Sequence, residues 1–394
     1  MRARGWDAID ILIVSGDAYV DHPAFGPVLV ARFLEARGYR VGFVAQPRWD
    51  RHDDVLRMGR PRLFAGISAG NLDSMLNKLT AQKKVRSDDP YSPGGRTGLR
   101  PNRATIVYAN LVRAAMPGVP IVLGGIEASL RRIAHYDYWS DEVRRSILLD
   151  AKADLLVFGM GERPAWEIAE RLAAGEPVHG LRDVRGTAHV LGKGEWEDIE
   201  ATRYVADGKP LFLPSYEEVS SDKRAFSEMS RLFQYETNPG NARSLLQPHG
   251  VQAVYLNPPA EPDVFAALDA TLAALAQPSS AARQRAHQAV FAAVASGHLD
   301  DSAAIILAAA IGDNDGAFAL AERAFLTDQP SNRDTRPNTK VLLRPATAAL
   351  RRDPRFAALA ARLGLTAYWK SNTAPDFCLR ETVAPCMDLK RGGR

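Results

Sequence analysis

The first two thirds of the chain alternates short apolar runs with amphipathic segments. Helical periodicity is found in four segments: 23–37, 72–84, 103–115 and 163–173. The apolar runs, read as buried parallel strands, are 9–14, 41–45, 63–68, 121–123 and 155–158. Regular alternation of strands and helices is typical of a layered α/β protein. The pattern therefore predicts an α/β fold built on a doubly wound parallel sheet.

The residues that follow the predicted strands are candidate ligand contacts, because most of these strands end in small or polar residues. In open α/β sheets, ligands bind at the carboxyl edge, where glycines let backbone N–H groups approach and helix N-termini favour anions. The alternative without a ligand is that these residues only form tight turns between strands and helices. We expect ligand contacts from Asp17, His22, Gly70, Asn71, Gly124, Gly125, Glu127, Ser129, Gly159, Gly161 and Glu162.

The first strand-end loop also places Asp17, Asp21 and His22 close together in sequence. A carboxylate beside an imidazole can tune its proton affinity, so these residues could form an acid/base or metal cluster. The alternative is that they only cap the loop.

Three segments of the N-terminal part depart from the regular alternation. The stretch 83–103 carries Pro, Gly and many charges, and predicts a long loop over the carboxyl edge of the sheet. Between 179 and 214, glycines and alternating apolar residues indicate a small β-hairpin. A helix is then expected over 216–233, and a last strand over 253–256.

The composition changes near Pro262, where Ala becomes dominant and strand patterns vanish. We therefore expect an α/β domain over 1–262 and an all-α, helical-hairpin region over 263–394. The clearest hairpin pairs 302–311 with 317–325 around a polar turn. Its small residues suit stacked helices of tetratricopeptide type, although one hairpin is not an array. Another helix is expected over 347–362, followed from Tyr368 by an irregular tail.

Composition and charge narrow the class of protein. Hydrophobic residues make up 46% and charged residues 24%, the balance of a globular protein rather than a disordered one. A net charge of +4 is too small to indicate nucleic-acid binding. The start of the chain lacks the apolar run of a signal peptide, and no apolar stretch is long enough to span a membrane. We expect a cytoplasmic protein without membrane contact.

Five strings in the N-terminal part resemble the YgiQ-type radical SAM family. They are SGDAYVDHP (15–23), YSPGGRTGLRPNR (91–103), GGIEASLRR (124–132), HYDYW (135–139) and GMGER (159–163). The likeness runs from about residue 7 to 257–259. It implies a Rossmann-like domain similar to cobalamin-binding modules, followed in the family by a radical SAM barrel. The segment 342–378 resembles the C-termini of bacterial tetratricopeptide-containing proteins.

The chain departs from the family pattern in its cysteines. The family's cofactors are S-adenosylmethionine and a four-iron four-sulfur cluster held by three closely spaced cysteines. Such clusters need thiolate ligands. This chain has two cysteines, Cys378 and Cys386, which we interpret as free thiols. We therefore expect no cofactor, no metal site and no catalytic residue in this chain.

Cobalamin is not expected either. Modules that hold cobalamin through a histidine usually carry the motif Asp-x-His-x-x-Gly. The nearest string here runs from Asp21 to Gly26 and has the wrong spacing, because His22 follows Asp21 directly.

The string HYDYW is dense in groups that hydrogen-bond and stack. We interpret His135, Tyr136, Asp137, Tyr138 and Trp139 as an interface toward the barrel that this chain lacks; the alternative is a substrate grip. Nearby arginines at 131, 132, 144 and 145 could bind anions, but arginines on helices are more often solvated or paired with carboxylates.

Three functions remain open. The leading hypothesis is the N-terminal accessory domain of a radical SAM protein, able to bind an unknown small molecule but not to start radical chemistry alone. The second is an interaction module in which the helical region binds a protein partner. The third is an artefact of gene fusion, which resequencing of the codons for 258–267 would reveal.

Overall fold

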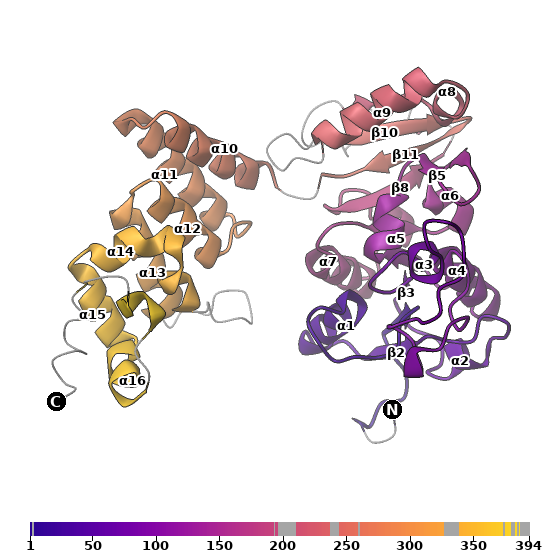
Figure 1. Ribbon diagram of the computed structural model, residues 1–394, viewed down its shortest axis with the longest axis horizontal. Coiled ribbons are helices and arrows are strands. Elements are labelled where there is room, and N and C mark those ends of the chain that lie inside the picture. The colour runs from indigo at the N-terminus through magenta and orange to yellow at the C-terminus, as the bar shows by residue number, and fades with distance from the viewer. Residues whose placement is uncertain are drawn as a thin grey trace. The chain divides into compact units, whose positions relative to one another are not determined.

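The computed structural model describes residues 1, 4–192, 194–195, 210–236, 244–258, 261–326, 339–372, 375–379, 383 and 386. The chain divides into two compact units, residues 1–259 and 260–394 (Figure 1). The first unit is α/β and the second is helical, as the sequence predicts.

The α/β unit is built on a mixed, mostly parallel sheet in which nine strands are described, in the order β2-β1-β3-β4-β7-β8-β11-β10-β9. Its parallel part confirms the five predicted strands within a few residues at their ends. These are β1 (Ile11–Ser15), β2 (Val41–Ala45), β3 (Phe64–Ser68), β4 (Ile121–Gly124) and β7 (Leu155–Val157). All five point their carboxyl ends to the same edge.

The rest of the sheet is less regular than predicted. It consists of β8 (Thr187–Leu191), β9 (Leu211–Phe212), β10 (Leu245–His249) and β11 (Gln252–Leu256). The expected hairpin within 179–214 is wrong for the described residues, because β8 pairs antiparallel with β7 and β11 rather than with a neighbour in that segment. Residues 193 and 196–209 of the segment lie outside the described part of the chain. The predicted strand over 253–256 is confirmed as β11.

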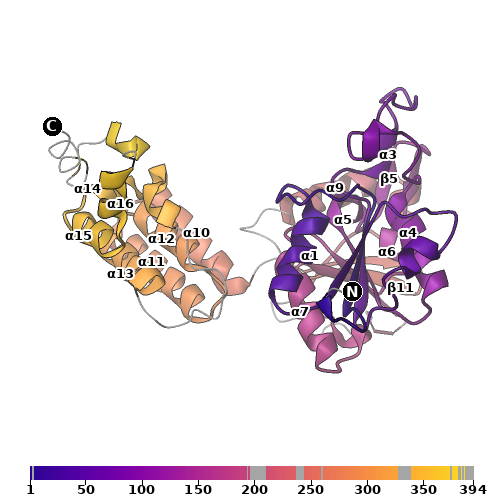
Figure 2. The ribbon, with the colours of Figure 1, turned by 90° about the horizontal axis from the view of Figure 1, so that it is seen from below.

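Helices cover both faces of the parallel strands (Figure 2). On one face lie α1 (Gly26–Ala36) and α7 (Glu162–Ala173), whose apolar residues share a core with Ile11, Phe64 and Val122. The opposite face packs against a second core. The helices on that side and at the carboxyl edge are α2 (Asp53–Leu56), α3 (Ser74–Lys78), α4 (Ala104–Ala115), α5 (Gly125–Leu130), α6 (Ile147–Ala151), α8 (Tyr216–Ser221) and α9 (Lys223–Glu236).

Two predicted helices are shorter or broken. The helix expected over 72–84 ends at Lys78, because the chain turns and Leu79 forms a bridge with Val85. The segment 216–233 forms α8 and α9, separated by the extended residue Asp222. The loop expected over 83–103 is confirmed, with one 3₁₀ turn at Pro93–Gly95. A separate two-stranded sheet joins β5 (His135–Asp137) to β6 (Glu142–Arg144).

The helical unit consists mainly of short helices around an Ala-rich core. They are α10 (Pro262–Ala276), α11 (Ser280–Ala295), α12 (Asp301–Ala310), α13 (Asn314–Leu326), α14 (Ala348–Arg352), α15 (Arg355–Arg362) and α16 (Leu365–Ser371), with 3₁₀ turns at Thr339–Leu343, Pro345–Thr347 and Asp376–Leu379. The predicted hairpin is confirmed as α12 and α13. The helix expected over 347–362 is divided between α14 and α15, where Pro354 begins a new helix.

Two predictions about the C-terminal region are corrected. The tail from Tyr368 is not wholly irregular, because α16 extends to Ser371; most residues after 379 lie outside the described part. Cys378 and Cys386 are not free thiols, because they form a disulfide and both are buried in the helical core. No helix among the described residues is long and apolar enough to span a bilayer.

Candidate functional site

A cavity of about 320 Å³ opens at the carboxyl edge of the parallel strands. It extends from the strand ends down between the sheet and helices α1 and α7. The sheet supplies Ile13, Phe64, Val122 and Val157, while Val30 of α1 and Ala165 of α7 lie opposite. We call this cavity the slot.

The slot exists because the sheet carries small residues between the two helices. Gly66 and Ser68 of β3 and Gly124 of β4 line it, and they alternate with residues whose side chains face the other core. A larger side chain at these positions would fill the space that α1 and α7 leave open. The low side-chain volume on one face of β3 and β4 thus creates the slot.

The mouth of the slot is formed by the loops that the sequence singled out. Seven of the expected ligand contacts line it: Gly70, Asn71, Gly124, Gly125, Gly159, Gly161 and Glu162. Gly70 has a φ of +109°, and a Cβ built on it would lie 2.1 Å from Asp17 Oδ1. Only glycine fits there.

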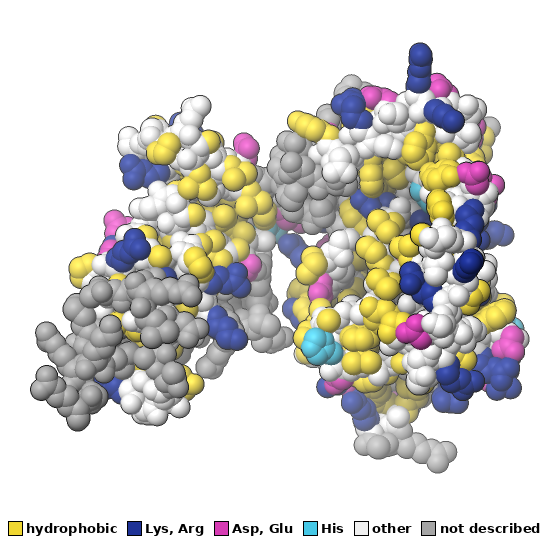
Figure 3. Space-filling view, viewed as in Figure 1, with side chains coloured by type: hydrophobic (Ala, Val, Ile, Leu, Met, Phe, Trp, Pro, Cys, Tyr) yellow, Lys and Arg dark blue, Asp and Glu magenta, His cyan; other side chains and the backbone are white. Residues whose placement is uncertain are grey.

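The surface around the mouth is apolar. Met160 is 82% exposed, and Ile126 and Leu130 of helix α5 are also exposed. Figure 3 shows hydrophobic side chains gathered on the face of the α/β unit where Figure 1 places α3 and α5. Exposed apolar patches of this kind mark binding sites for ligands or partners.

The remaining four expected contacts do not line the slot. Asp17 is buried behind Gly70, and Ser129 accepts a hydrogen bond from Arg132 through its carbonyl. His22 accepts a hydrogen bond from the Ala24 backbone at 3.1 Å. Glu127 is 1% exposed and faces away from the slot toward two helices.

The Glu127 carboxylate caps those helices. Oε2 accepts from the Ser74 N–H of α3 at 2.8 Å, and Oε1 accepts from the Thr105 N–H of α4 at 2.9 Å. The Ser74 hydroxyl in turn accepts from the Ala104 N–H at 3.0 Å. Backbone N–H groups at helix starts lack partners within the helix, so a buried carboxylate satisfies them. Glu127 therefore orients the elements around the site.

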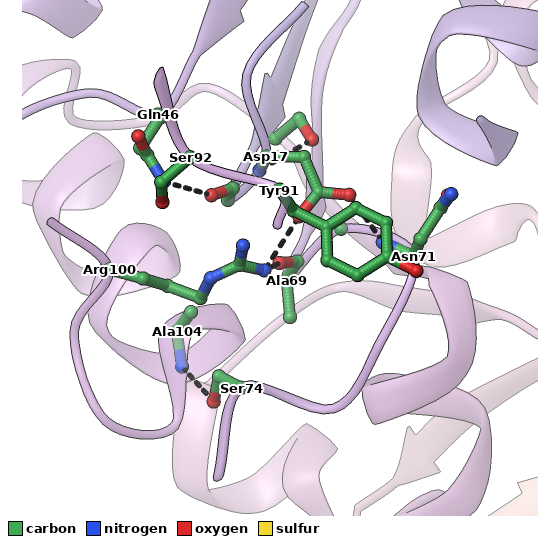
Figure 4. Close-up of polar contacts among 12 residues, drawn as sticks. Asp17, Gln46, Ala69, Asn71, Ser74, Tyr91, Ser92, Arg100 and Ala104 are labelled. Atoms are coloured by element: carbon green, nitrogen blue, oxygen red, sulfur yellow. Dashed lines mark hydrogen bonds and ion pairs between the residues drawn. The ribbon is translucent and has the colours of Figure 1, made fainter. Parts of the chain in front are cut away.

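A buried ion-pair network lies directly beneath the loop after β3 (Figure 4). Arg100 Nη1 lies 2.7 Å from Asp17 Oδ1 and donates to the Ala69 carbonyl at 2.7 Å. Arg100 Nη2 lies 3.4 Å from Asp89 Oδ2. The Asn71 N–H donates to Asp17 Oδ2 at 2.6 Å. The network fixes the loop that carries Gly70 and Asn71 at the mouth.

The pKa values of the two acids in this network are shifted in opposite directions. Desolvation raises the pKa of Asp17, and this outweighs the lowering by Arg100. Desolvation also acts on Asp89, but hydrogen bonds from Asn77 and Ser92 lower its pKa below the usual value. Asp89 therefore carries the firmer negative charge beside Arg100.

The loop 83–103 is anchored to the sheet edge through the same network. Gln46 Nε2 donates to the Ser92 hydroxyl at 2.6 Å and to the Gly16 carbonyl at 3.0 Å. The Tyr91 carbonyl accepts from the Ala18 N–H at 2.8 Å. Sequence reasoning missed Arg100, although it stands in the string YSPGGRTGLRPNR, because its partners Asp17 and Asp89 are brought to it only by the folded loop.

The acid/base cluster proposed on the first loop is not supported by its contacts. Asp17 pairs with Arg100, Asp21 lies 3.6 Å from Arg32, and His22 caps the turn before α1. No group of three His, Cys, Asp or Glu side chains suited to a metal ion is found among the residues that the structure describes.

The HYDYW string forms β5 and the turn after it. Asp137 is buried and accepts from Arg103 at 2.5 Å, while the Trp139 N–H donates to its other oxygen at 2.9 Å. Tyr136 and Tyr138 are each 49% exposed. Burial lowers the pKa of His135 to about 4, so the ring is neutral at pH 7. The string thus combines an anchored inner side with an exposed aromatic outer side.

The neighbouring arginines are mostly paired with carboxylates. Arg131 pairs with Asp73, and Arg144 and Arg145 pair with Asp150. Arg132 instead lies between two aromatic rings. Its guanidinium carbon is 4.7 Å from the centroid of the Phe158 ring and 4.4 Å from that of the Phe233 ring. Burial lowers the pKa of Arg132 to about 10, which leaves it charged.

Comparison with known proteins identifies the family. The model of the Radical SAM N-terminal family matches residues 1–293, which includes α10 and most of α11. UPF0313 protein YgiQ of Escherichia coli strain K12 is 47% identical over 307 residues, covering 66% of this chain and 42% of the relative. A UPF0313 protein of Geobacter sulfurreducens is 52% identical over 270 residues, covering 68% of this chain and 43% of the relative.

The chain thus spans about two fifths of the length of these curated relatives. Among solved structures, the radical S-adenosylmethionine methyltransferase TsrM of Kitasatospora setae matches with a TM-score of 0.29 and 17% identity, covering 45% of this chain and 28% of that protein. The family match covers most of the chain and includes every loop around the slot. The chain therefore belongs to the YgiQ-type radical SAM family, whose N-terminal domain it contains.

Proposed function

We propose that residues 1–259 are a small-molecule-binding accessory domain of a YgiQ-type radical SAM protein, and that this chain does not start radical chemistry alone. The slot carries the first part of the proposal. It lies at the carboxyl edge of the parallel strands, where open α/β sheets bind ligands, and its volume is in the range of small-molecule pockets.

The chain's cysteines support the second part. The family's cluster requires three thiolates, whereas this sequence has two cysteines. The structure joins both of them in one disulfide, so neither offers a thiolate. The residues of this chain do not fit the cluster, and we assign no catalytic residue.

Two further expectations belong to the same proposal. The exposed outer side of the HYDYW string, with Tyr136 and Tyr138, would contact the polypeptide that carries the cluster. The domain would act in the cytoplasm. The Cys378–Cys386 disulfide weighs against that location, since disulfides are rare in reducing compartments.

The binding proposal is tested by native mass spectrometry of the full chain incubated with a bacterial small-molecule extract. Ala165→Phe places a ring inside the slot, while Ala173→Phe adds the same ring on the exposed end of α7. We expect one compound per chain on the parent protein and on Ala173→Phe, but none on Ala165→Phe. Circular dichroism checks that both variants fold. Equal binding to all three proteins, or to none, contradicts the proposal.

The helical unit supports a second candidate, a protein-interaction module. Leu272 and Leu275 of α10 are 61% and 47% exposed, and they lie on one side of the helix. An exposed apolar stripe suits a partner's helix. A partner that copurifies with the parent chain should be lost from Leu272→Glu/Leu275→Glu and kept by Arg283→Glu on α11. Its retention by the double variant removes this candidate.

A further inference from the structure

We infer that the slot takes an uncharged, apolar ring system about the size of two fused rings, inserted between the sheet and helices α1 and α7. The inference rests on the proposed function and names the class of ligand for the same cavity. Any polar part of the ligand stays outside, at the mouth.

The side chains that line the slot determine whether a charged group can be inserted. Below the mouth, the lining side chains are apolar, among them Leu29, Val30, Phe64 and Val122. Of the residues that line the slot, Glu162 carries the ionisable side chain, and it stands at the rim in the first turn of α7. A charged group pushed past the rim would lose its hydration without gaining an oppositely charged partner, which strongly disfavours its insertion.

Two polar groups near the floor of the mouth have protein partners, while the Ser68 O–H can still donate to one neutral acceptor of a ligand. The Ser68 hydroxyl accepts from the Gly70 N–H at 3.1 Å, and the Asn71 N–H donates to Asp17. Because the other side chains below the mouth are apolar, recognition of the inserted group depends mainly on apolar contact. Glu162 at the rim adds repulsion against an anion.

The volume decides the size of the inserted group. An apolar cavity of about 150 Å³ holds one benzene ring. The slot, at about 320 Å³, has room for roughly twice that volume. Its floor is closed by Ile13 and Phe64, which lie over Gly66: a Cβ on Gly66 would come within 2.8 Å of Ile13 Cδ1. A bicyclic ring fills this space, whereas a single ring leaves part of it empty.

The mouth suits a ligand that is larger than the inserted ring. Met160 and Ile126 are exposed beside the opening, so apolar parts of the ligand outside the slot gain further contact. The carboxamide of Asn71, at the same opening, offers a donor and an acceptor to a polar part.

Isothermal titration with four matched probes tests the inference: indole, benzene, indole-2-carboxylate and its methyl ester. We expect indole to bind at least about tenfold more tightly than benzene and than the carboxylate. The neutral methyl ester should bind more tightly than the carboxylate, because it has the same ring without the charge. Indole binding should be lost in Ala165→Phe and kept in Ala173→Phe.

The outcomes separate this inference from the proposed function. Suppose that the carboxylate or benzene binds as tightly as indole, and that Ala165→Phe abolishes the binding of each probe. The slot is then a binding site, but the ligand class is wrong. If no probe binds, the ligand class is wrong, and the native mass spectrometry of the same variants decides whether the slot binds another compound. If indole binds and Ala165→Phe leaves its binding unchanged, the slot is not the site and the proposed function fails with it.

Discussion

The two units of this chain are stabilised by different means. The α/β unit buries ionised side chains, with Asp17, Arg100 and Glu127 all nearly inaccessible to solvent. The helical unit is built on small apolar residues, and its core includes Ala293, Ala304, Ala308, Ala317 and Ala321. Its one buried arginine among the described residues, Arg351, donates to the backbone carbonyls of Leu342 and Arg344.

This difference shows where the chain can support a specific site. Buried charges are costly unless they are paired, so a network that keeps them fixes the loops around it in one arrangement. In the α/β unit that network lies beneath the mouth of the slot. Packing of small residues holds helices together without ordering a polar site. The following substitutions test this contrast, beginning with the largest expected effect.

Arg100→Met should destabilise the α/β unit by about 3–5 kcal/mol, because it leaves Asp17 and Asp89 buried without their cation. Urea unfolding followed by tryptophan fluorescence measures the loss. Arg48→Met is the matched control, since Arg48 pairs with Asp50 on the surface, and no measurable change is expected there. A parent-like midpoint for Arg100→Met would mean that the network is not essential to the unit.

Cys378→Ser should destabilise the helical unit by about 2–3 kcal/mol, the value expected for opening a loop closed over eight residues. The α/β unit should be unaffected, which makes the two units distinguishable in one chain. Dithiothreitol should lower the melting temperature of the parent helical unit to that of the variant and leave the variant unchanged. Insensitivity of both proteins to the reductant would show that the disulfide does not stabilise the unit.

Glu127→Gln should cost about 2 kcal/mol, because it removes the charge from two hydrogen bonds to helix N–H groups. Chemical denaturation and thermal melting of the full chain measure this loss of stability. Glu228→Gln, on the exposed side of α9, loses a surface pair with Arg231 and serves as the control. The account requires the Glu127 variant to be clearly less stable than this control.

His189→Leu should remove part of the acid sensitivity of the α/β unit. His189 is buried against Tyr255, and burial lowers its pKa to about 3. The unfolded chain therefore binds the proton first, so His189 supports the fold fully above about pH 6.5 and less as the pH falls toward 3. At pH 5.5 the parent should lose about 1.4 kcal/mol relative to pH 7 from this residue.

Denaturation at pH 7 and pH 5.5 measures that loss. The His189→Leu variant should show a smaller difference between the two pH values, with a remainder from His135, whose pKa is also lowered by burial. An identical pH dependence in parent and variant would contradict the assignment.

Much of the fold follows from local patterns in the sequence. The five parallel strands are apolar runs ended by small residues, and the hairpin α12–α13 has clear helical periodicity. The antiparallel half of the sheet was not predicted as such, because the partners of β8 are set by tertiary pairing with β7 and β11. The early end of α3 depends on a turn and on a bridge to Val85, which periodicity does not reveal.

The site was predicted only in part, because local patterns indicate its loops but not the tertiary contacts around them. Glycines after strands indicate the mouth, and Gly70, Gly124 and Gly159 all line it. The slot itself depends on which face of β3 and β4 the small residues occupy, and on helices that cross that face. Glu127 was expected to contact a ligand, but its partners come from α3 and α4, about 53 and 22 residues away in sequence.

Anaerobic reconstitution with iron and sulfide, followed by absorption spectroscopy and iron analysis, tests the central claim most directly. The claim is that this chain carries the accessory domain of a radical SAM protein without the means to hold the cluster. We expect no stoichiometric iron–sulfur chromophore, because the two cysteines are too few and are joined to each other. A stable brown protein with close to four irons per chain would contradict the account.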